Sequence, residues 1–234
     1  MGCILKGSSG LWSRLSAGAV LLATGADERL AGRPAALLEL GGVPLILRQL
    51  IALSGAGVDE LAVVLGHDAA QIEPVLQAFP IHVVHDPEPG LGAPASLGRA
   101  LPVLSPRLDA VIVAPGALPL VDAQDVTALI GAFKKRAGAA LVVPRAADGE
   151  PGAALIAEAA LRDQWIAAGV DAEALRGAGS VAGRVAWLDV AHRRLHTVIR
   201  SVGDIDAFAT ATGHRLSGPA VDAARSGGAL ETAT

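Results

Sequence analysis

The stretch that decides the fold is Ala17-Gly-Ala-Val-Leu-Leu-Ala-Thr-Gly25, an apolar run that ends in a small polar residue and a glycine. A short, unbroken apolar run is typical of a strand that is buried on both faces. The glycine that follows it allows a tight turn. These features predict that residues 17–23 form a buried strand whose carboxyl end opens into a loop of small residues.

Strand-like and helix-like segments alternate along the chain after this first strand. Apolar runs predict further strands over 61–65, 81–84, 109–114 and 139–143. Helical spacing of apolar residues predicts helices over 44–53, 69–79, 95–104 and 121–133. Such alternation favours a mostly parallel sheet covered by helices on both faces. We therefore expect an α/β fold, a Rossmann-like three-layer sandwich with a mostly parallel sheet and a short antiparallel extension.

The pattern changes after Arg145, where shorter pieces follow one another. Strand-like pieces cover 153–156, 185–188 and 195–199, with a helix near 158–167 and another over 204–212. The strand-like pieces form either an antiparallel edge of the sheet or a small lid. We expect the chain to divide into a leader (1–16), a single domain (17–214) and a flexible tail rich in Ser, Gly and Ala (215–234).

Composition excludes several classes of protein. The 234 residues include one cysteine, Cys3, so neither a disulfide framework nor a cysteine-based zinc cluster forms within the chain. A net charge of −4 and 3% aromatic residues argue against nucleic-acid partners, which need basic surfaces or stacking side chains. No uninterrupted apolar run reaches the roughly 18 residues of a membrane span. We expect a cytoplasmic protein that binds neither nucleic acid nor membrane.

Two loops carry the candidate binding residues. The first follows the opening strand, where the backbone N–H groups of Ala23, Thr24 and Gly25 can approach phosphates and Arg29 can bind one with two hydrogen bonds. The alternative is a plain tight turn followed by a surface arginine. The second loop runs from Gly90 to Ser96.

The second loop matches a relaxed dinucleotide-binding pattern, Gly-x-Gly-x-x-Ala, but only in its letters. The predicted strand ends at Val84, well before the loop, and no acidic residue closes a following strand. We therefore favour a loop whose backbone, at Gly90 and Gly92, contacts the edge of a base, with Ser96 at the start of a helix.

Two histidines and two arginines gather near the end of the chain, at His192, Arg193, Arg194 and His196. They form either a small anion-binding patch or the charged residues that protect an exposed strand edge. The latter is the more common use of such a cluster.

Two motifs near the start of the chain carry a family resemblance. Leu22-Ala-Thr-Gly-Ala-Asp-Glu-Arg-Leu-Ala31 and Leu37-Leu-Glu-Leu-Gly-Gly-Val-Pro-Leu45 are similar to Leu-Ala-Ala-Gly-x-Ser-x-Arg-Met-Gly and Leu-Leu-x-x-Gly-Gly-Lys-Pro-Leu. Further likenesses follow in order at residues 63–67, 85–97, 114–121 and 142–144. Over about residues 17–210 the chain resembles the MobA-like nucleotidyltransferases, in particular the molybdenum cofactor cytidylyltransferases.

The resemblance implies both a reaction and a set of site residues. In the family, a terminal phosphate of a pterin cofactor attacks the α-phosphorus of a nucleoside triphosphate, and pyrophosphate leaves. The resemblance assigns a catalytic role to Arg29 and nucleotide binding to Ala23, Thr24, Gly25, Gly90, Gly92 and Ser96. It also implies magnesium held by carboxylates, if the protein is active; otherwise no cofactor is expected.

The chain differs from the family at several positions where the family has charged residues. The two family lysines correspond to Ala35 and Val43, and the only lysines are Lys6, Lys134 and Lys135. The Asp before Pro-Leu corresponds to Ala117, and the metal-binding Asp of Asp-Thr-Pro-Glu-Asp-Leu corresponds to Arg200. The His and Pro of the family's Gly-His-Pro correspond to Ala153 and Ala154. The Asp of a later Leu-x-Gly-Asp corresponds to Ala178.

Replacement groups are available in the sequence. Asp27 and Asp204 are candidate substitutes for the lost metal ligands, although Asp204 also suits the N-cap of a helix. Alternatively, Arg200 binds phosphate directly in place of the metal.

Three hypotheses follow from these departures. The chain binds a nucleoside triphosphate or a pterin cofactor with impaired or absent catalysis, it is an active transferase with relocated metal ligands, or it is a non-catalytic scaffold. The retained loops favour binding, and the losses at Ala117 and Arg200 favour the first hypothesis over the second. A homodimer, or a partner in molybdoenzyme maturation, fits each of them.

Overall fold

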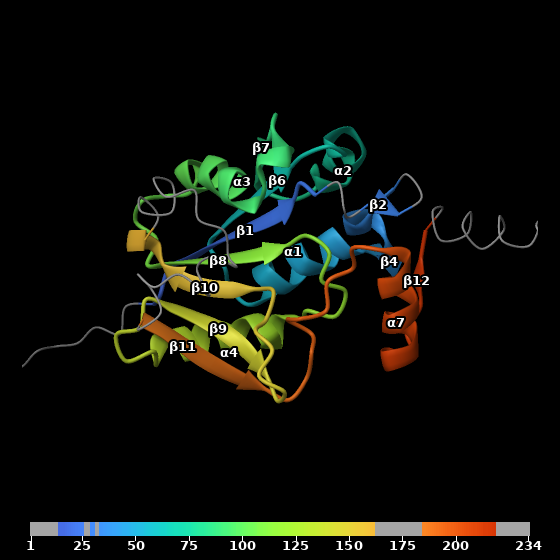
Figure 1. The fold of residues 1–234 in the computed structure, drawn as a ribbon. Coiled ribbons are helices and arrows are strands. Elements are labelled where there is room, and N and C mark those ends of the chain that lie inside the picture. Colours follow the sequence, from blue (N-terminus) through green and yellow to red (C-terminus); the bar gives the residue numbers. More distant parts are fainter. Residues whose placement is uncertain (1–13, 26–28, 31–32, 162–183, 219–234) are drawn as a thin grey trace, which may run out of the picture.

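The structure is a computed structural model that describes residues 14–25, 29–30, 33–161 and 184–218. Its centre is a seven-stranded sheet with the strand order β11-β9-β10-β8-β1-β6-β7 (Figure 1). The strands are β1 (Ala17–Ala23), β6 (Glu60–Leu65), β7 (His82–His85), β8 (Ala110–Pro115), β9 (Leu141–Ala146), β10 (Leu155–Glu158) and β11 (Val185–Val190).

The sheet is mostly parallel, as the sequence predicts. Strand β1 pairs in parallel with both β6 and β8, and the β6–β7 and β9–β11 pairs are parallel as well. Strand β10 runs antiparallel to β8 and to β9 and lies between them. The antiparallel strand expected after Arg145 is therefore present, but it lies inside the sheet and not at its edge, and β11, which does form the edge, is parallel to β9.

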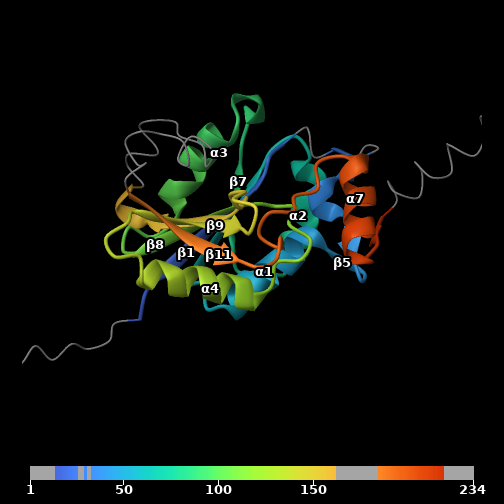
Figure 2. The ribbon, with the colours of Figure 1, turned by 60° about the horizontal axis from the view of Figure 1, so that its bottom comes forward.

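Helices cover both faces of the sheet and make the fold a three-layer sandwich (Figure 2). On one face, α1 (Leu45–Gly55), α2 (Ala69–Leu76) and α4 (Ala123–Lys134) share a core with Ala19 and Leu21 of β1. On the other face, α3 (Ala93–Ala100) packs against Val20 of the same strand. Successive residues of a strand point to opposite faces, so an unbroken apolar run supplies both cores.

Two small sheets and several short helices complete the described chain. The pair β2 (Arg29–Leu30) and β3 (Arg33–Pro34) is antiparallel, and β12 (Leu216–Ser217), β4 (Glu39–Leu40) and β5 (Val43–Pro44) form a second antiparallel sheet. Helix α7 (Val202–Thr212) buries Ile205 and Phe208. The 3₁₀ helices are η1 (Ala35–Leu37), η2 (Pro89–Leu91), η3 (Leu101–Val103) and η4 (Ala159–Leu161).

The boundaries of several helices differ from prediction for local reasons. The helix predicted over 121–133 begins at Ala123, because Asp122 caps it. The helix predicted over 95–104 ends at Ala100 and continues as the 3₁₀ helix η3, whose first turn contains a proline. Of the helix predicted near 158–167, only η4 is seen, since residues 162–167 lie outside the described chain.

Two predictions for the second half of the chain are wrong. Residues 195–199 form no strand, but a turn and an extended segment that cross the carboxyl ends of the sheet. Leu195 and Ile199 are buried there, so their apolar character reflects contact with the core and not strand pairing. The disorder predicted from Arg215 does not apply to Leu216, which is buried and pairs with Leu40. Residues 219–234 lie outside the described chain.

No helix within the described ranges is both long and apolar enough to cross a lipid bilayer.

Candidate functional site

The candidate site lies at the edge of the sheet where the carboxyl ends of β1, β6, β7 and β8 meet. The chain passes from β1 through β6 to β7 on one side, and then returns to form β8 on the other side of β1. This reversal makes the β1–β8 border a topological switch point, where ligands bind in open α/β sheets. Ala23 and Thr24 at the end of β1 therefore lie where the sequence predicts a binding loop.

Two glycines keep this edge closely packed. A Cβ atom on Gly66, directly after β6, would lie 2.5 Å from the Thr24 carbonyl oxygen and 2.9 Å from Pro89. A Cβ atom on Gly116, directly after β8, would lie 3.1 Å from the Ala23 Cβ. His67 Nδ1 also lies 3.3 Å from the Thr24 carbonyl oxygen. The loop after β1 is therefore held between the ends of β6 and β8, with no room for a side chain at either glycine.

The rest of the first predicted loop is described only in part. Gly25 is half-buried beside Thr24, and the backbone of Arg29 pairs with Pro34 in the β2–β3 hairpin. Asp27 and Ala178 lie outside the described residues. The roles predicted for Arg29 and Asp27 therefore stay predictions.

The second predicted loop has a different internal structure from the one expected. Gly90 lies in η2, and Gly92 has a φ of +87°, which favours glycine, and precedes the first residue of α3. Ser96 lies inside α3 and is 0% exposed. Its hydroxyl donates a hydrogen bond to Asp86 Oδ2 at 2.5 Å. The prediction that Ser96 stands at a helix start is corrected, since this side chain faces inward and positions the loop.

Asp86, which the sequence analysis did not select, is the buried centre of that loop. Its Oδ1 accepts the Glu88 backbone N–H at 2.9 Å and pairs with Arg99 Nη1 at 2.9 Å. Arg99 also pairs with Glu88 at 3.1 Å. A buried carboxylate needs such partners to offset its loss of water. Its position directly after a predicted strand was the available signal for its role.

Ala117 and the residue before Arg200 are joined in this structure by a backbone hydrogen bond. The Ile199 backbone N–H donates to the Ala117 carbonyl oxygen at 3.1 Å, which places Arg200 next to the β8–α4 loop. Ala117 is 0% exposed, and Arg200 is exposed. Within the described ranges, no group of three or more His, Cys, Asp or Glu side chains is arranged to hold a metal ion.

Asp204 serves the start of α7. Ser201 is the N-cap, and Asp204 is the third residue of the helix, so the prediction of Asp204 as the N-cap is corrected. Its Oδ2 accepts the backbone N–H groups of Arg200 at 2.9 Å and of Ser201 at 2.8 Å, and the Ser201 hydroxyl at 3.0 Å. This reciprocal arrangement is a capping box. The correspondence of Arg200 to the first Asp of the family motif stays a prediction.

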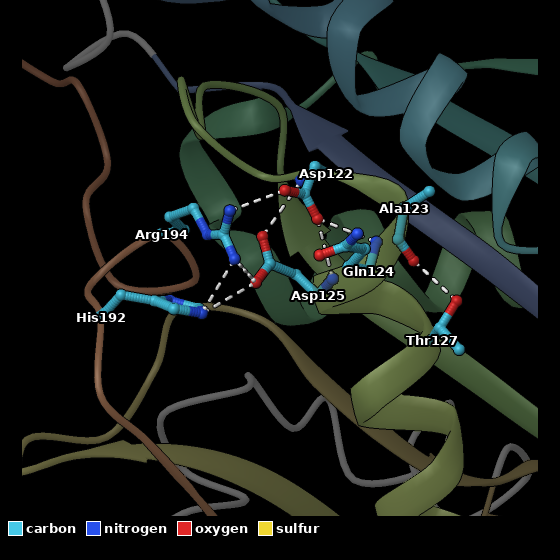
Figure 3. A network of polar contacts seen from close by, with 7 residues as sticks. All are labelled: Asp122, Ala123, Gln124, Asp125, Thr127, His192 and Arg194. Atoms are coloured by element: carbon cyan, nitrogen blue, oxygen red, sulfur yellow. Dashed lines mark hydrogen bonds and ion pairs between the residues drawn. The ribbon is translucent and has the colours of Figure 1, made fainter.

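The charged cluster near the end of the chain is not a strand edge, since residues 191–200 form no strand, and its side chains contact carboxylates. Arg194 pairs with Asp122 at 2.6 Å and with Asp125 at 3.1 Å, and His192 Nε2 lies 3.3 Å from Asp125 (Figure 3). Arg193 pairs with Asp148. Carboxylates within the chain therefore pair with both guanidinium groups.

His196 differs from the other members of this cluster. Its Nε2 lies 3.1 Å from the Glu150 carbonyl oxygen, to which it donates as the neutral tautomer with a proton on that nitrogen. Burial lowers the pKa of His196 below its ordinary value, and this is the largest of the contributing effects. The lowered pKa favours a neutral ring, so His196 adds no cation to the cluster.

A cavity of about 440 Å³ opens at the carboxyl ends of β9 and β11, on the same edge of the sheet. Its lining includes Arg145 and Asp189, which pair at 2.8 Å, and the backbone of Gly149. The Arg145 guanidinium also lies 5.3 Å from the centre of the Trp187 ring.

Asp125 is a buried carboxylate, and its burial disfavours the charged form. Burial raises the pKa of Asp125 above its ordinary value of 3.8, and the Asp122 backbone N–H and Arg194 offset only part of the rise. The native state therefore holds the Asp125 proton to a higher pH than the unfolded chain does. The contribution of Asp125 to the free energy of unfolding falls as pH rises from 3.8 through the raised pKa.

Asp125→Asn is expected to remove this pH dependence. The free energy of unfolding of the variant, relative to the parent, should increase as pH rises from about 4. Urea denaturation at a series of pH values measures the difference. A relative stability that is constant or falls with rising pH contradicts a raised pKa at Asp125.

Comparisons with known proteins agree with this fold. A family model, the MobA-like NTP transferase domain, matches residues 19–211. Rv0371c from Mycobacterium tuberculosis H37Rv superposes with a TM-score of 0.72 at 22% identity, covering 85% of this chain and 100% of that chain. A second structure of Rv0371c, with a TM-score of 0.68 at 22% identity over 84% of this chain and 100% of that one, is a complex with manganese.

A curated relative matches the sequence over a shorter region. The bifunctional protein GlmU of Syntrophomonas wolfei is 29% identical over 126 residues, which are 53% of this chain and 28% of that protein. The chain thus spans little more than a quarter of this relative. The family model, in contrast, covers most of the chain from β1 to α7. The chain therefore belongs to the MobA-like NTP transferase domain family.

Proposed function

We propose that this protein binds a nucleoside triphosphate at the β1–β8 border and that its nucleotide-transfer activity is impaired or absent. The observation that carries the proposal is the Ile199–Ala117 backbone hydrogen bond of 3.1 Å, which brings Arg200, the next residue, close to the β8–α4 loop that contains Ala117. The family resemblance places two metal-binding carboxylates there. This chain has a buried methyl group and a guanidinium instead.

The residues present can bind phosphate by two means. The loop after β1 offers backbone N–H groups at a sheet edge packed tightly by Gly66 and Gly116. Arg200 adds a cation, and a guanidinium binds phosphate oxygens with two parallel hydrogen bonds. Arg200 is exposed, and its backbone is fixed by Asp204 at 2.9 Å. We infer that Arg200 neutralises phosphate charge where the family uses a metal.

The residues at this position do not fit a magnesium ion. Magnesium prefers oxygen ligands in octahedral geometry, and Ala117 provides no side-chain oxygen. Arg200 would repel the ion, and Asp204 Oδ2 already accepts three hydrogen bonds. Metal ions stabilise transition-state charge by several kcal/mol, out of the roughly 8–23 kcal/mol by which enzymes lower barriers. This loss is the reason for expecting slow or absent transfer.

The ligand beside the nucleotide is proposed from the family resemblance. A phosphorylated pterin is the acceptor class in the molybdenum cofactor branch, and the cavity of about 440 Å³ near Arg145 lies on the same sheet edge. We therefore include pterin binding in the proposal, with a role in molybdoenzyme maturation as a carrier or partner subunit. Assembly as a homodimer remains a prediction.

Membership of a transferase family favours the second hypothesis, an active enzyme with relocated metal ligands.

The test is a pyrophosphate-release assay with CTP or GTP, run with magnesium or manganese and with a pterin phosphate acceptor. The melting temperature is measured in parallel with each nucleotide and a chelator. We expect nucleotides to raise the melting temperature without pyrophosphate release. Metal-dependent release supports the active enzyme, and no stabilisation by either nucleotide or pterin leaves only a scaffold.

A further inference from the structure

Two segments far apart in the sequence are joined beside the carboxyl end of β8, and one of them ends at Arg200. One segment, residues 117–125, leads from β8 into α4, and the other, residues 192–200, leads from β11 to α7. They are joined at one end by the Ile199–Ala117 backbone hydrogen bond. At the other end they are joined by the side chains of Figure 3. The second segment has no helix or strand of its own, so side-chain and single backbone contacts hold it. Besides the two named here, Arg193, Leu195 and His196 contact residues 148–153.

The side-chain contacts at the second end form what we name the clamp: Asp122, Asp125, His192 and Arg194. Arg194 Nη1 donates to Asp122 Oδ2 at 2.6 Å, and Arg194 Nη2 lies 3.1 Å from Asp125 Oδ1. His192 Nε2 lies 3.3 Å from the same oxygen of Asp125. One guanidinium thus bridges two carboxylates, and the Asp125 side chain is only 2% exposed.

Each carboxylate of the clamp divides its two oxygens between two tasks. Asp122 Oδ1 accepts the backbone N–H groups of Gln124 and Asp125, and Asp125 Oδ2 accepts the backbone N–H of Asp122. These bonds form the capping box of α4. The opposite oxygens face Arg194. Removing Arg194 therefore takes away two of the three side-chain contacts between the second segment and the start of α4, without removing a cap of the helix.

Stability alone is a poor explanation for the clamp. The Nε atom of Arg194 is buried and has no hydrogen-bond partner within the described part of the chain. The Arg194 and Asp122 side chains are 31% and 43% exposed, and partly exposed ion pairs commonly contribute little net stability. Polar groups that are buried at such cost are often found where a site needs fixed geometry.

We propose that the clamp is a positioning device for Arg200, holding the segment that ends at this residue in register with the β8–α4 loop. The inference rests on the proposed function, since it assigns Arg200 to the phosphates of a bound nucleotide. Asp122, Asp125, His192 and Arg194 are positioning residues, because their own contacts are with one another. The clamp fixes one end of the segment, and the Ile199–Ala117 bond fixes the other.

The test is a double-mutant cycle between Arg194→Gln and Arg200→Gln, read as the dissociation constants of CTP and GTP in the presence of a chelator. Arg194→Gln alone is expected to weaken binding about tenfold, as a misplaced charged contact typically does. In the Arg200→Gln background, the same change is expected to have no further effect, because the clamp acts through Arg200. Cytidine and guanosine, which have no phosphates, should bind equally to the parent and to Arg194→Gln.

Controls separate positioning from folding. Arg184→Gln breaks an exposed ion pair with Glu158 at the amino end of β11, far from the site, and should leave the dissociation constants unchanged. Arg194→Lys retains one charged contact and is expected to restore part of the affinity. Asp125→Asn provides a second route to the same loss if Arg194→Gln does not fold.

The outcomes distinguish the clamp from the proposed function. Normal binding by both Arg194→Gln and Asp125→Asn, with normal binding by the parent, overturns the clamp alone. An undiminished effect of Arg194→Gln in the Arg200→Gln background also overturns it. Absence of triphosphate binding by the parent overturns both inferences.

Discussion

Replacing Arg200 with alanine is expected to weaken the binding of nucleoside triphosphates by roughly tenfold to a hundredfold in the absence of metal. Hydrogen bonds to charged groups contribute about 1.5–3 kcal/mol, and each 1.4 kcal/mol is a factor of ten in affinity. The backbone of Arg200 is held by Asp204, so the substitution removes the cation without releasing the start of α7. Arg200→Asp should reduce affinity further, because it places an anion where the phosphates bind.

The matched control for this prediction is Arg107→Ala. Arg107 is exposed and precedes β8, at the amino end of the sheet, opposite the candidate site. Isothermal titration with CTP and GTP measures each variant in a chelator. Equal affinities for the parent, Arg200→Ala and Arg107→Ala would show that Arg200 does not contact the phosphates.

Gly66→Ala is expected to damage both stability and nucleotide binding. The new methyl group would lie 2.5 Å from the Thr24 carbonyl oxygen and 2.8 Å from its Cα, and both are backbone atoms. Backbone atoms cannot rotate away as a side chain does, so β1 and β6 must separate or the loop after β1 must move. Overpacking of this kind costs about 1–3 kcal/mol of unfolding free energy. A displaced loop also loses the orientation of its N–H groups toward phosphate.

Gly98→Ala is the control for the same substitution. Gly98 lies in α3, and a Cβ atom there meets nothing within 4 Å. Alanine in a helix interior is favoured over glycine by about 0.5–1 kcal/mol, so this variant should be slightly more stable than the parent. Urea denaturation compares the variants. Unchanged stability and binding in Gly66→Ala would contradict the close packing of the loop.

The parts of the fold that follow from local patterns were predictable. The run 17–23 became β1 with the predicted bounds, because a buried central strand is apolar throughout and the following glycine marks its end. The alternation of strands and helices predicted the parallel sheet and its three layers. The antiparallel strand β10 was foreseen only as a change in pattern, since its partners β8 and β9 are chosen by tertiary packing.

Other parts were set by long-range contacts that no local pattern encodes. The apolar character of Leu195 and Ile199 suggested a strand, but their backbone groups bond to Ala153 and Ala117 in single contacts and no ladder forms. Leu216 is ordered because it pairs with Leu40, which is distant in sequence.

In the candidate site, too, some features follow from local sequence patterns and others depend on long-range contacts. The sequence predicted the bounds of β1 and hence where the loop after it begins, whereas the roles assigned to Ala117 and Arg200 from the family motifs stay predictions. It did not reveal that Arg194 reaches Asp122 across 72 positions, since charges of opposite sign are common at such separations. It also gave no sign that the Ser96 hydroxyl is directed at Asp86. Contacts of this kind depend on which loops the completed fold brings together.

Whether a divalent ion takes part in triphosphate binding is the most direct question about this protein. The dissociation constant of the parent chain for CTP or GTP, measured by calorimetry with a chelator and again with millimolar magnesium or manganese, answers it. We expect a submillimolar constant that changes by less than about threefold between the two conditions, since Arg200 replaces the metal. Binding that requires the ion, or that tightens more than about tenfold with it, would show that carboxylates elsewhere in the chain hold a metal and that Arg200 does not replace it.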